Sequence, residues 1–334
     1  LFAQILYRKY LYSNNKPIKG YFNAIEAACE EWNIDAVIGF CMPYYIPVTM
    51  ASTNINALKI LIQFDPFTNN QTLPKGRKWE KRRQLESEVI NKLDSLFVVD
   101  FVYDEMSRLG LGNSNKLISM PFPAIETDAD GNFNNLEDFN NKLNCDNKNK
   151  IIKFLYTGVF YDIIRNPEFL LKLFEKLPEN YEFHFVGGGA WNTVKKFVNK
   201  LGKRLVLYGW RSSDEVKNFL READILVCLN NSITNQMSSK LLEYICTGKP
   251  VLNIYKVDDC PSLKYTAKYK NCMDLKEAEI TPEMINKIIN FVDAHINKLE
   301  PLDDIMKNFK ENTDFHAANM IEDKLNELLK NRSK

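Results

Sequence analysis

The hydrophobic and polar positions of the chain alternate between short apolar runs and longer amphipathic segments. In its first part, several short runs are apolar on both faces and bounded by polar residues, which is typical of buried parallel strands. These runs are residues 34–40, 58–64, 95–100 and 116–122. Helix-like stretches such as residues 78–93 separate them. This alternation predicts a parallel sheet with helices on both faces.

A second and more regular series follows further along the chain. Its predicted strands are residues 151–158, 181–189, 204–210, 224–230 and 250–255. The predicted helices between them are residues 167–177, 190–201, 213–222 and 239–247. The two series together predict an α/β protein with two Rossmann-like, doubly wound domains that face a cleft.

Polar composition predicts the domain boundaries. Residues 126–150 are rich in Asn and Asp and show little apolar periodicity, so we interpret 123–150 as a linker. The domains are then residues 1–122 and 151–302, followed by helices in residues 303–334 that return to the first domain. The chain begins without Met, and we expect a natural N-terminal piece to precede it.

Charge and composition exclude several classes of function. The 334 residues contain 44 Lys and Arg against 43 Asp and Glu, so no global basic field is available to hold nucleic acid. The seven cysteines lack C-x-x-C spacing, which favours free thiols in a reducing cytoplasm. The three histidines lie far apart, so no metal site is expected. We find no signal peptide, and no apolar run approaches the roughly 20 residues of a membrane span.

Ligands of doubly wound sheets bind beyond the carboxyl ends of the strands, so the residues that follow each strand are the candidates for a site. Gly158 follows the first strand of the second series, and Arg165 stands just before a helix predicted to start near Asn166. A cation at a helix start opposes the dipole unless an anion lies nearby. The alternative is an Arg165 that points into solvent.

Glycines mark the ends of the next two strands. Gly187 and Gly188 belong to a run of three glycines that lets a ligand or another backbone approach closely. Tyr208 and Gly209 end the following strand, where their backbone groups could meet a flat base. Ser212 or Ser213, with Glu215, then predicts a capped helix start.

The stretch Ser238-Ser239-Lys240 opens the predicted helix 239–247, with either serine as its N-cap. Amides at a helix start can bind phosphate oxygens, and Lys240 adds a positive charge. Glu243 lies one turn later among apolar residues. A partly buried carboxylate needs hydrogen-bond donors, which a sugar diol would supply. The alternative is a Glu243 on the solvent-facing stripe of the helix.

Four blocks in residues 151–256, among them "YTGVFYDIIRNP", "FHFVGGG" and "SSKLLEYICTGKPVL", resemble retaining glycosyltransferases of family four, which have the GT-B fold. The resemblance implies that Glu243 binds the donor ribose, and that Arg165 and the Ser239-Lys240 start face the diphosphate. Asn235 stands where the family commonly has a glutamate, and Val159 where many members have an arginine. The first domain matches weakly, and the family's first strand has no counterpart, so this domain is expected to be incomplete.

The implied reaction is metal-independent hexosyl transfer from a nucleotide-diphosphate sugar, without a cofactor, to a glycan or lipid-linked acceptor. In the first domain, Asp65 directly follows strand 58–64 and suits an acceptor-facing carboxylate, although an Asp before Pro66 also favours a turn. The basic segment 73–84 could meet an anionic acceptor or the inner face of a membrane. A non-catalytic sugar-binding or nucleotide-binding protein and a sugar-nucleotide epimerase remain alternatives. The sequence does not indicate the oligomeric state.

Overall fold

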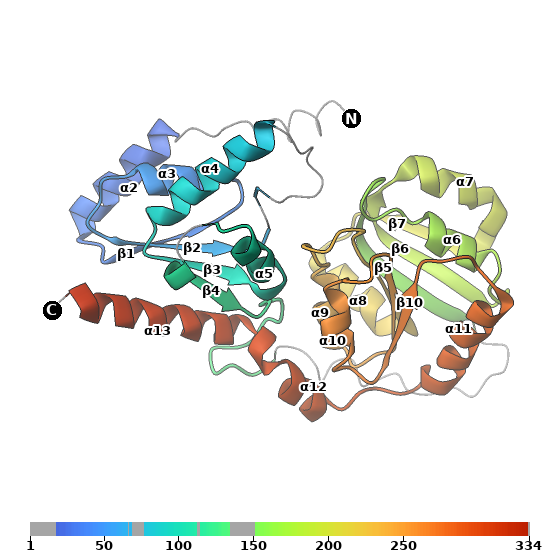
Figure 1. The fold of residues 1–334 in the computed structure, drawn as a ribbon. Helices are drawn as coiled ribbons and strands as arrows, with labels where there is room; N and C mark the ends of the chain where they lie inside the picture. The colour runs from blue at the N-terminus through green and yellow to red at the C-terminus, as the bar shows by residue number, and fades with distance from the viewer. Residues whose placement is uncertain (1–17, 66, 69–76, 112–113, 134–150, 333–334) are drawn as a thin grey trace. The chain divides into compact units, whose positions relative to one another are not determined.

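The computed structural model describes residues 18–65, 67–68, 77–111, 114–133 and 151–332 (Figure 1). Its contacts divide the chain into two compact units. Unit 1 contains residues up to Pro123 together with the segment from Asp314 onward, and unit 2 runs from Ala124 to Thr313. Most of the linker predicted over 123–150, including Cys145, lies outside the described residues.

Unit 1 is built on a parallel sheet of four described strands in the order β1-β2-β3-β4. The strands are β1 (Ala36–Phe40), β2 (Leu58–Gln63), β3 (Ser95–Val99) and β4 (Leu117–Met120). The helices are α2 (Lys19–Trp32), α3 (Tyr45–Ser52), α4 (Arg77–Asn91), α5 (Asp100–Arg108) and α13 (Asp314–Arg332). The four strands predicted from the apolar runs are present. β2 and β3 are buried on both faces, whereas β1 exposes Ile38 and Phe40.

The C-terminal helix α13 contributes to the core of unit 1. Ala317 is buried in this core, and Met320, Ile321 and Leu325 pack against it. Phe315 and Ala318 of the same helix are exposed. Near its end, α13 places Arg332 3.6 Å from a carboxylate oxygen of Asp94.

Unit 2 has a six-stranded parallel sheet in the order β10-β9-β8-β5-β6-β7. Its strands are β5 (Ile152–Phe160), β6 (Tyr181–Gly189), β7 (Leu205–Gly209), β8 (Ile225–Leu229), β9 (Val251–Tyr255) and β10 (Cys272–Lys276). The helices are α6 (Glu168–Phe174), α7 (Trp191–Leu201), α8 (Ser213–Glu222), α9 (Lys240–Ile245), α10 (Ser262–Thr266), α11 (Pro282–His295) and α12 (Leu302–Phe309). The predicted Rossmann-like topology is confirmed.

Helices cover both faces of the sheet in unit 2. Side chains of α6, α7 and α11 share a core with one face, whereas α8, α9 and α10 contact the strands from the other side (Figure 1). Helix α8 begins as predicted, with a capping box in which Ser212 and Glu215 each bond the other's backbone N–H. The six cysteines in the described residues are all free thiols.

Candidate functional site

The order of the strands reverses between β5 and β8. The chain builds β5, β6 and β7 in one direction and then returns to place β8 on the other side of β5. Strands β5 and β8 run parallel to each other, so the turns that follow them lie at the same edge of the sheet. Ligands of doubly wound sheets bind at such a switch point. Arg165 follows β5, and the loop 230–239 follows β8, so two of the predicted segments come together here.

Arg165 is held in a tight turn after β5. Tyr161 and Arg165 exchange backbone hydrogen bonds of 3.1 Å in both directions. The guanidinium also lies 5.7 Å from the centre of the Tyr161 ring, within the range of a cation–π contact. Helix α6 starts later than expected, at Glu168, because Asn166 bonds the Glu168 N–H with its side-chain oxygen.

Arg165 reaches across the switch point to the loop after β8. Its Nε donates a hydrogen bond of 3.0 Å to Oδ1 of Asn231. Burial raises the pKa values of Tyr156 and Cys228 to about 12, although the positive charge of Arg165 acts on both in the opposite direction. The guanidinium therefore lies close enough to β5 and β8 to influence their side chains.

The loop 230–239 is bonded to the Arg165 turn near its start and contains three of the predicted residues. The Ser232 N–H donates to the Ile164 carbonyl at 2.7 Å, which ties this loop to the Arg165 turn. Asn235 is only 1% exposed and Ser238 only 4% exposed. Ser239 is exposed and occupies the N-cap position of α9. The predicted N-cap position is therefore confirmed at Ser239, although its side chain makes no cap bond.

Helix α9 presents Lys240 and Glu243 on its outer side. Four side chains of the helix are buried, namely Leu241, Leu242, Tyr244 and Ile245. The Tyr244 hydroxyl accepts a 2.9 Å hydrogen bond from the Thr157 N–H and so fixes α9 against β5. The Lys240 ammonium pairs with the Glu243 carboxylate, and the two side chains are 33% and 38% exposed. The helix has six residues, fewer than the predicted range 239–247.

The predicted glycines Gly158, Gly187 and Gly188 lie within strands β5 and β6. Gly158 pairs with Gly187 in the register of β5 and β6, so both belong to the ladder. Gly187 has φ +138°, and a Cβ there would lie 1.8 Å from the Gly158 carbonyl oxygen. Close approach of two backbones, one of the two predicted options, requires glycine at position 187.

The end of β7 carries an aromatic residue that the prediction overlooked. Gly209 has φ +70° with open space beside it, and the Trp210 side chain is 69% exposed. The Trp210 indole lies against Gly188, where a Cβ would meet its Nε1 at 3.1 Å. Tyr208 instead turns its hydroxyl to Nδ1 of His184 at 2.9 Å. A tryptophan directly after a strand-ending glycine was the available signal.

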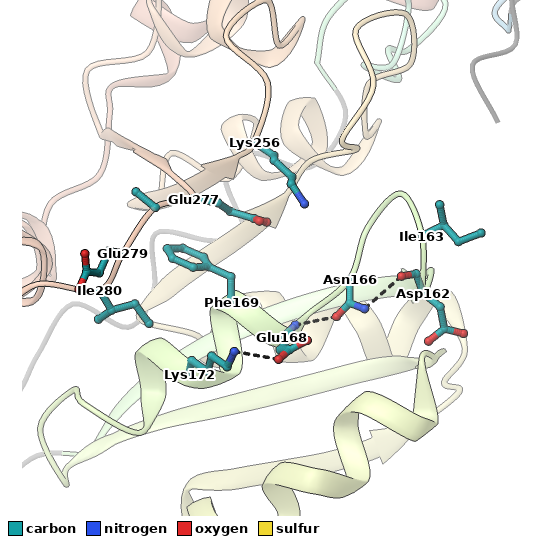
Figure 2. Close-up of a pocket in the computed structure, with 11 residues that line it drawn as sticks. Asp162, Ile163, Asn166, Glu168, Phe169, Lys172, Lys256, Glu277, Glu279 and Ile280 are labelled. Carbon is teal, nitrogen blue, oxygen red and sulfur yellow. Dashed lines mark hydrogen bonds and ion pairs between the residues drawn. The ribbon is translucent and has the colours of Figure 1, made fainter.

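A cavity of about 550 Å³ opens beside the Arg165 turn (Figure 2). Asp162, Ile163 and Asn166 line it from that turn, while Lys256 and Glu277 line it from the ends of β9 and β10. Burial raises the pKa of Glu277, although the Lys256 charge opposes this shift. None of the residues predicted from the sequence lines this cavity.

Asp65, the predicted residue of the first domain, belongs to unit 1. It stands two residues after the end of β2 and is half-buried. Across the described ranges, no group of three or more His, Cys, Asp or Glu side chains could hold a metal ion. None of the helices described for either unit is long and apolar enough to cross a membrane.

Known proteins share this fold at low sequence identity. HepE from Anabaena in complex with UDP is 11% identical with a TM-score of 0.64, covering 94% of this chain and 85% of that chain. Sucrose-phosphate synthase from Thermosynechococcus elongatus is 13% identical with a TM-score of 0.64, covering 92% and 77%. The lipopolysaccharide outer core galactosyltransferase WaaB in its apo form is 14% identical with a TM-score of 0.56, covering 88% and 75%.

Comparison of the sequence with known families gives one match. No curated protein sequence matches the chain. The family model described as glycosyl transferases group 1 matches residues 152–263, which run from β5 into α10 and include Arg165, Lys240 and Glu243. The resemblance inferred from the sequence is thus confirmed at the level of fold and family. Residues 152–263 match the family described as glycosyl transferases group 1, and the chain has the two-domain GT-B fold.

Proposed function

We propose that this protein is a family four glycosyltransferase that moves a hexosyl group from a nucleotide-diphosphate sugar to a glycan or lipid-linked acceptor, with retention of configuration. The observation that carries the proposal is the Arg165–Asn231 hydrogen bond across the switch point of unit 2. It holds a cation at the edge of the sheet where doubly wound domains bind ligands. The family match over residues 152–263 supports the same site.

Charge supports a site for the diphosphate in this region. Arg165 offers a planar guanidinium, which suits bidentate contacts with phosphate oxygens. Lys240 stands at the start of α9, after the loop to which the Arg165 turn is bonded. We propose that these two cations, rather than a metal ion, stabilise the negative charge that gathers on the leaving diphosphate. Helix α9 has only six residues. We therefore assign the phosphate contacts to the Arg165 and Lys240 side chains rather than to the amides at the start of this helix.

Glu243 is the proposed acceptor of hydrogen bonds from the donor ribose. Its carboxylate is paired with Lys240 when no ligand is bound. Both partners are about one third exposed, so the pair stays accessible to a ligand. We propose that the donor separates them, with the ammonium turning to a phosphate and the carboxylate to the ribose diol. Two new charge-assisted contacts would then offset the lost ion pair.

The nucleotide base is proposed to lie at the end of β7. The main chain at Tyr208 and Gly209 offers hydrogen-bonding groups there, and the space beside Gly209 is open. Trp210 adds an exposed aromatic surface next to it. Gly187 and Gly188 are proposed to support this region, because glycine there leaves room for the Gly158 carbonyl and the Trp210 indole. Gly158, which pairs with Gly187, is proposed to contribute in the same way.

We propose that unit 1 binds the acceptor. In the proposed reaction, the bond between the anomeric carbon and the diphosphate oxygen breaks. The acceptor oxygen then bonds the same carbon, and its proton passes to the departing diphosphate oxygen. Asp65 is proposed to face that acceptor. Asn235 and Ser238 are proposed to face the donor sugar, although their burial means that the loop 230–239 would have to adjust.

The proposed location is the cytoplasm, with contact at the inner face of the membrane when the acceptor is lipid-linked. The basic segment 73–84 is the proposed contact, but residues 73–76 lie outside the described part of the chain. UDP is the first ligand to test, because HepE has also been solved with UDP-glucose and with UDP plus glucose.

A thermal-shift screen over nucleotide sugars tests the proposal, because a ligand that binds only the folded state raises its stability. We expect one nucleotide sugar to raise the melting temperature more than its free sugar does. Incubating that donor with candidate glycans, followed by product analysis, separates transfer from epimerisation and from binding alone. Absence of any shift across the screen would contradict the proposal.

A further inference from the structure

A buried polar network crosses the core of unit 2 from β10 to β8. At its centre is Asn253, which is 0% exposed in the middle of β9. The Asn253 amide donates to Oδ1 of Asp274 at 2.7 Å and to Oγ of Ser262 at 3.1 Å. Its Oδ1 accepts from Nδ2 of Asn230 at 2.6 Å. A buried amide is costly unless it is bonded, and here both ends of the side chain have partners.

The network ends at the loop that contains the site. Asn230 is the first residue after β8, and its side chain also donates to the Ile254 carbonyl at 3.0 Å. The next residue, Asn231, is the acceptor for Nε of Arg165 at 3.0 Å. Hydrogen bonds and one peptide unit therefore connect β10, β9, β8 and the turn after β5. Two residues, Asn230 and Asn231, link Asn253 to Arg165, and Asn253 has no role in the site described above.

We propose that Asn253 is a positioning residue, which holds Asn230 and Asn231 in place so that Arg165 is fixed where it meets the diphosphate of the donor. The inference rests on the proposed function, because Arg165 must bind that diphosphate for its position to matter. An arginine side chain is flexible, and fixing it before the ligand arrives reduces the entropy that binding must offset. Without Asn253, Asn230 keeps only its bonds to the Ile254 carbonyl, and the Asn231 acceptor is less firmly held.

A double-mutant cycle with Asn253→Leu and Arg165→Met tests the proposal. The readouts are the dissociation constants of UDP and of uridine, which lacks phosphate. We expect Asn253→Leu to raise the dissociation constant of UDP about tenfold and to change that of uridine by less than about twofold. The double variant should bind UDP no more weakly than Arg165→Met alone, because both changes disable the same cation.

Asn271→Leu is the matched control. Asn271 is also a buried asparagine of unit 2, and its side chain donates to the carbonyls of Gly248 and Lys298. It directly precedes β10, at the opposite edge of the sheet from the carboxyl ends. The variant should lower the melting temperature while leaving the ratio of the UDP and uridine affinities unchanged. An equal change of that ratio in both variants would overturn a specific role for Asn253.

Asn253→Asp is a second variant, and its result does not depend on whether the buried position 253 accepts a leucine. The new carboxylate oxygen would face Oδ1 of Asp274, which lies 2.7 Å from the present amide. Two carboxyl groups at this distance share a proton at low pH and repel each other at high pH. Nearby Cys260 and Cys272 do not interfere, because burial raises the pKa of both thiols. UDP affinity relative to the unchanged protein should therefore be restored near pH 5.5 and lost near pH 8.

The outcomes separate this inference from the proposed function. If Arg165→Met weakens UDP but Asn253→Leu does not, the positioning role is wrong and the proposed function stands. Additive losses of UDP affinity in the double variant, or an Asn253→Asp variant without pH dependence, would overturn the positioning role as well. If the unchanged protein does not bind UDP, or Arg165→Met has no effect, the proposed diphosphate site and the inference both fail.

Discussion

Arg165 and Asn231 are joined by a hydrogen bond of 3.0 Å from Nε to Oδ1, although they stand 66 residues apart in sequence. The bond links the segments after β5 and β8, the two strands between which the order of the sheet reverses. It uses one N–H of the guanidinium and leaves its terminal nitrogens to other partners. A cation fixed in this way at a switch point is suited to hold an anionic ligand.

Replacing Arg165 with Met should weaken binding of UDP by about 10- to 100-fold and change binding of uridine little, since only UDP carries the diphosphate. Calorimetric titration of both ligands measures the difference. Lys200→Met is the control, because Lys200 is an exposed cation of the same unit that pairs with Glu175. Equal weakening of UDP and uridine in the Arg165 variant would mean that the phosphates bind elsewhere.

Glu243→Ala should weaken UDP and uridine alike, by roughly tenfold to a hundredfold, because both contain the ribose diol. Lys240→Met should affect UDP more than uridine. These two residues are paired in the free protein, so removing either also releases the other. Titrations of the two variants should therefore differ in their ligand preference. A folded Glu243→Ala variant with unchanged affinity would remove this carboxylate from the site.

Trp210→Ala should weaken uridine and UDP by a similar factor of roughly tenfold, because stacking on a base is worth ~1–3 kcal/mol. Trp210→Phe should retain most of the affinity. Quenching of tryptophan fluorescence by UDP should disappear in Trp210→Phe and persist in Trp191→Phe, where the replaced indole is also exposed. Persistence of the quenching in Trp210→Phe would place the base away from the end of β7.

The strand-end rule predicted where Arg165 and Glu243 would lie because it depends on topology, which short apolar runs reveal well. Strand β10 was missed, since this edge strand exposes Asp274 and Lys276 and has no continuous apolar run. Helix α3 was missed as well, because five of its eight residues are buried and a helical period is hard to recognise there.

The sequence did not predict which side chains contact one another. Lys240 and Glu243 are three positions apart on a helix, which permits an ion pair but does not require one. The run of three glycines after Val186 left open whether a ligand or another backbone approaches closely, and the pairing of β6 with β5 shows that a backbone does. Trp210 was overlooked because its contact with Gly188, a residue of the neighbouring strand, cannot be read from the local sequence.

Ending the chain after Asn312 should destabilise unit 1 far more than unit 2, because α13 covers part of the unit 1 core. Burial of a few hundred Å² of apolar surface is worth several kcal/mol at ~25 cal/mol per Å². Hydrogen exchange on the truncated protein should show loss of protection in β2 and β3, with β5 to β9 little changed. Equal loss in the two units would contradict this account.

A pair of point variants gives the same test in the full chain. Ala317 is 7% exposed, whereas its neighbour Ala318 is exposed. Ala317→Asp would bury a charge against the unit 1 core and should lower its stability by several kcal/mol, whereas Ala318→Asp should change it by less than about 0.5 kcal/mol. Similar melting curves for the two variants would mean that α13 contributes little to unit 1.

Hydrogen exchange of the unchanged protein, with and without saturating UDP, tests the central claim most directly. The account predicts that UDP slows exchange in the turn 161–165, in the loop 230–239 and in α9, where the diphosphate and ribose would bind. The end of β7 should be protected as well, whereas α11 and α12 should be unaffected. Protection confined to other segments, or none at a UDP concentration that saturates binding, would contradict a donor site at the carboxyl ends of β5 and β8.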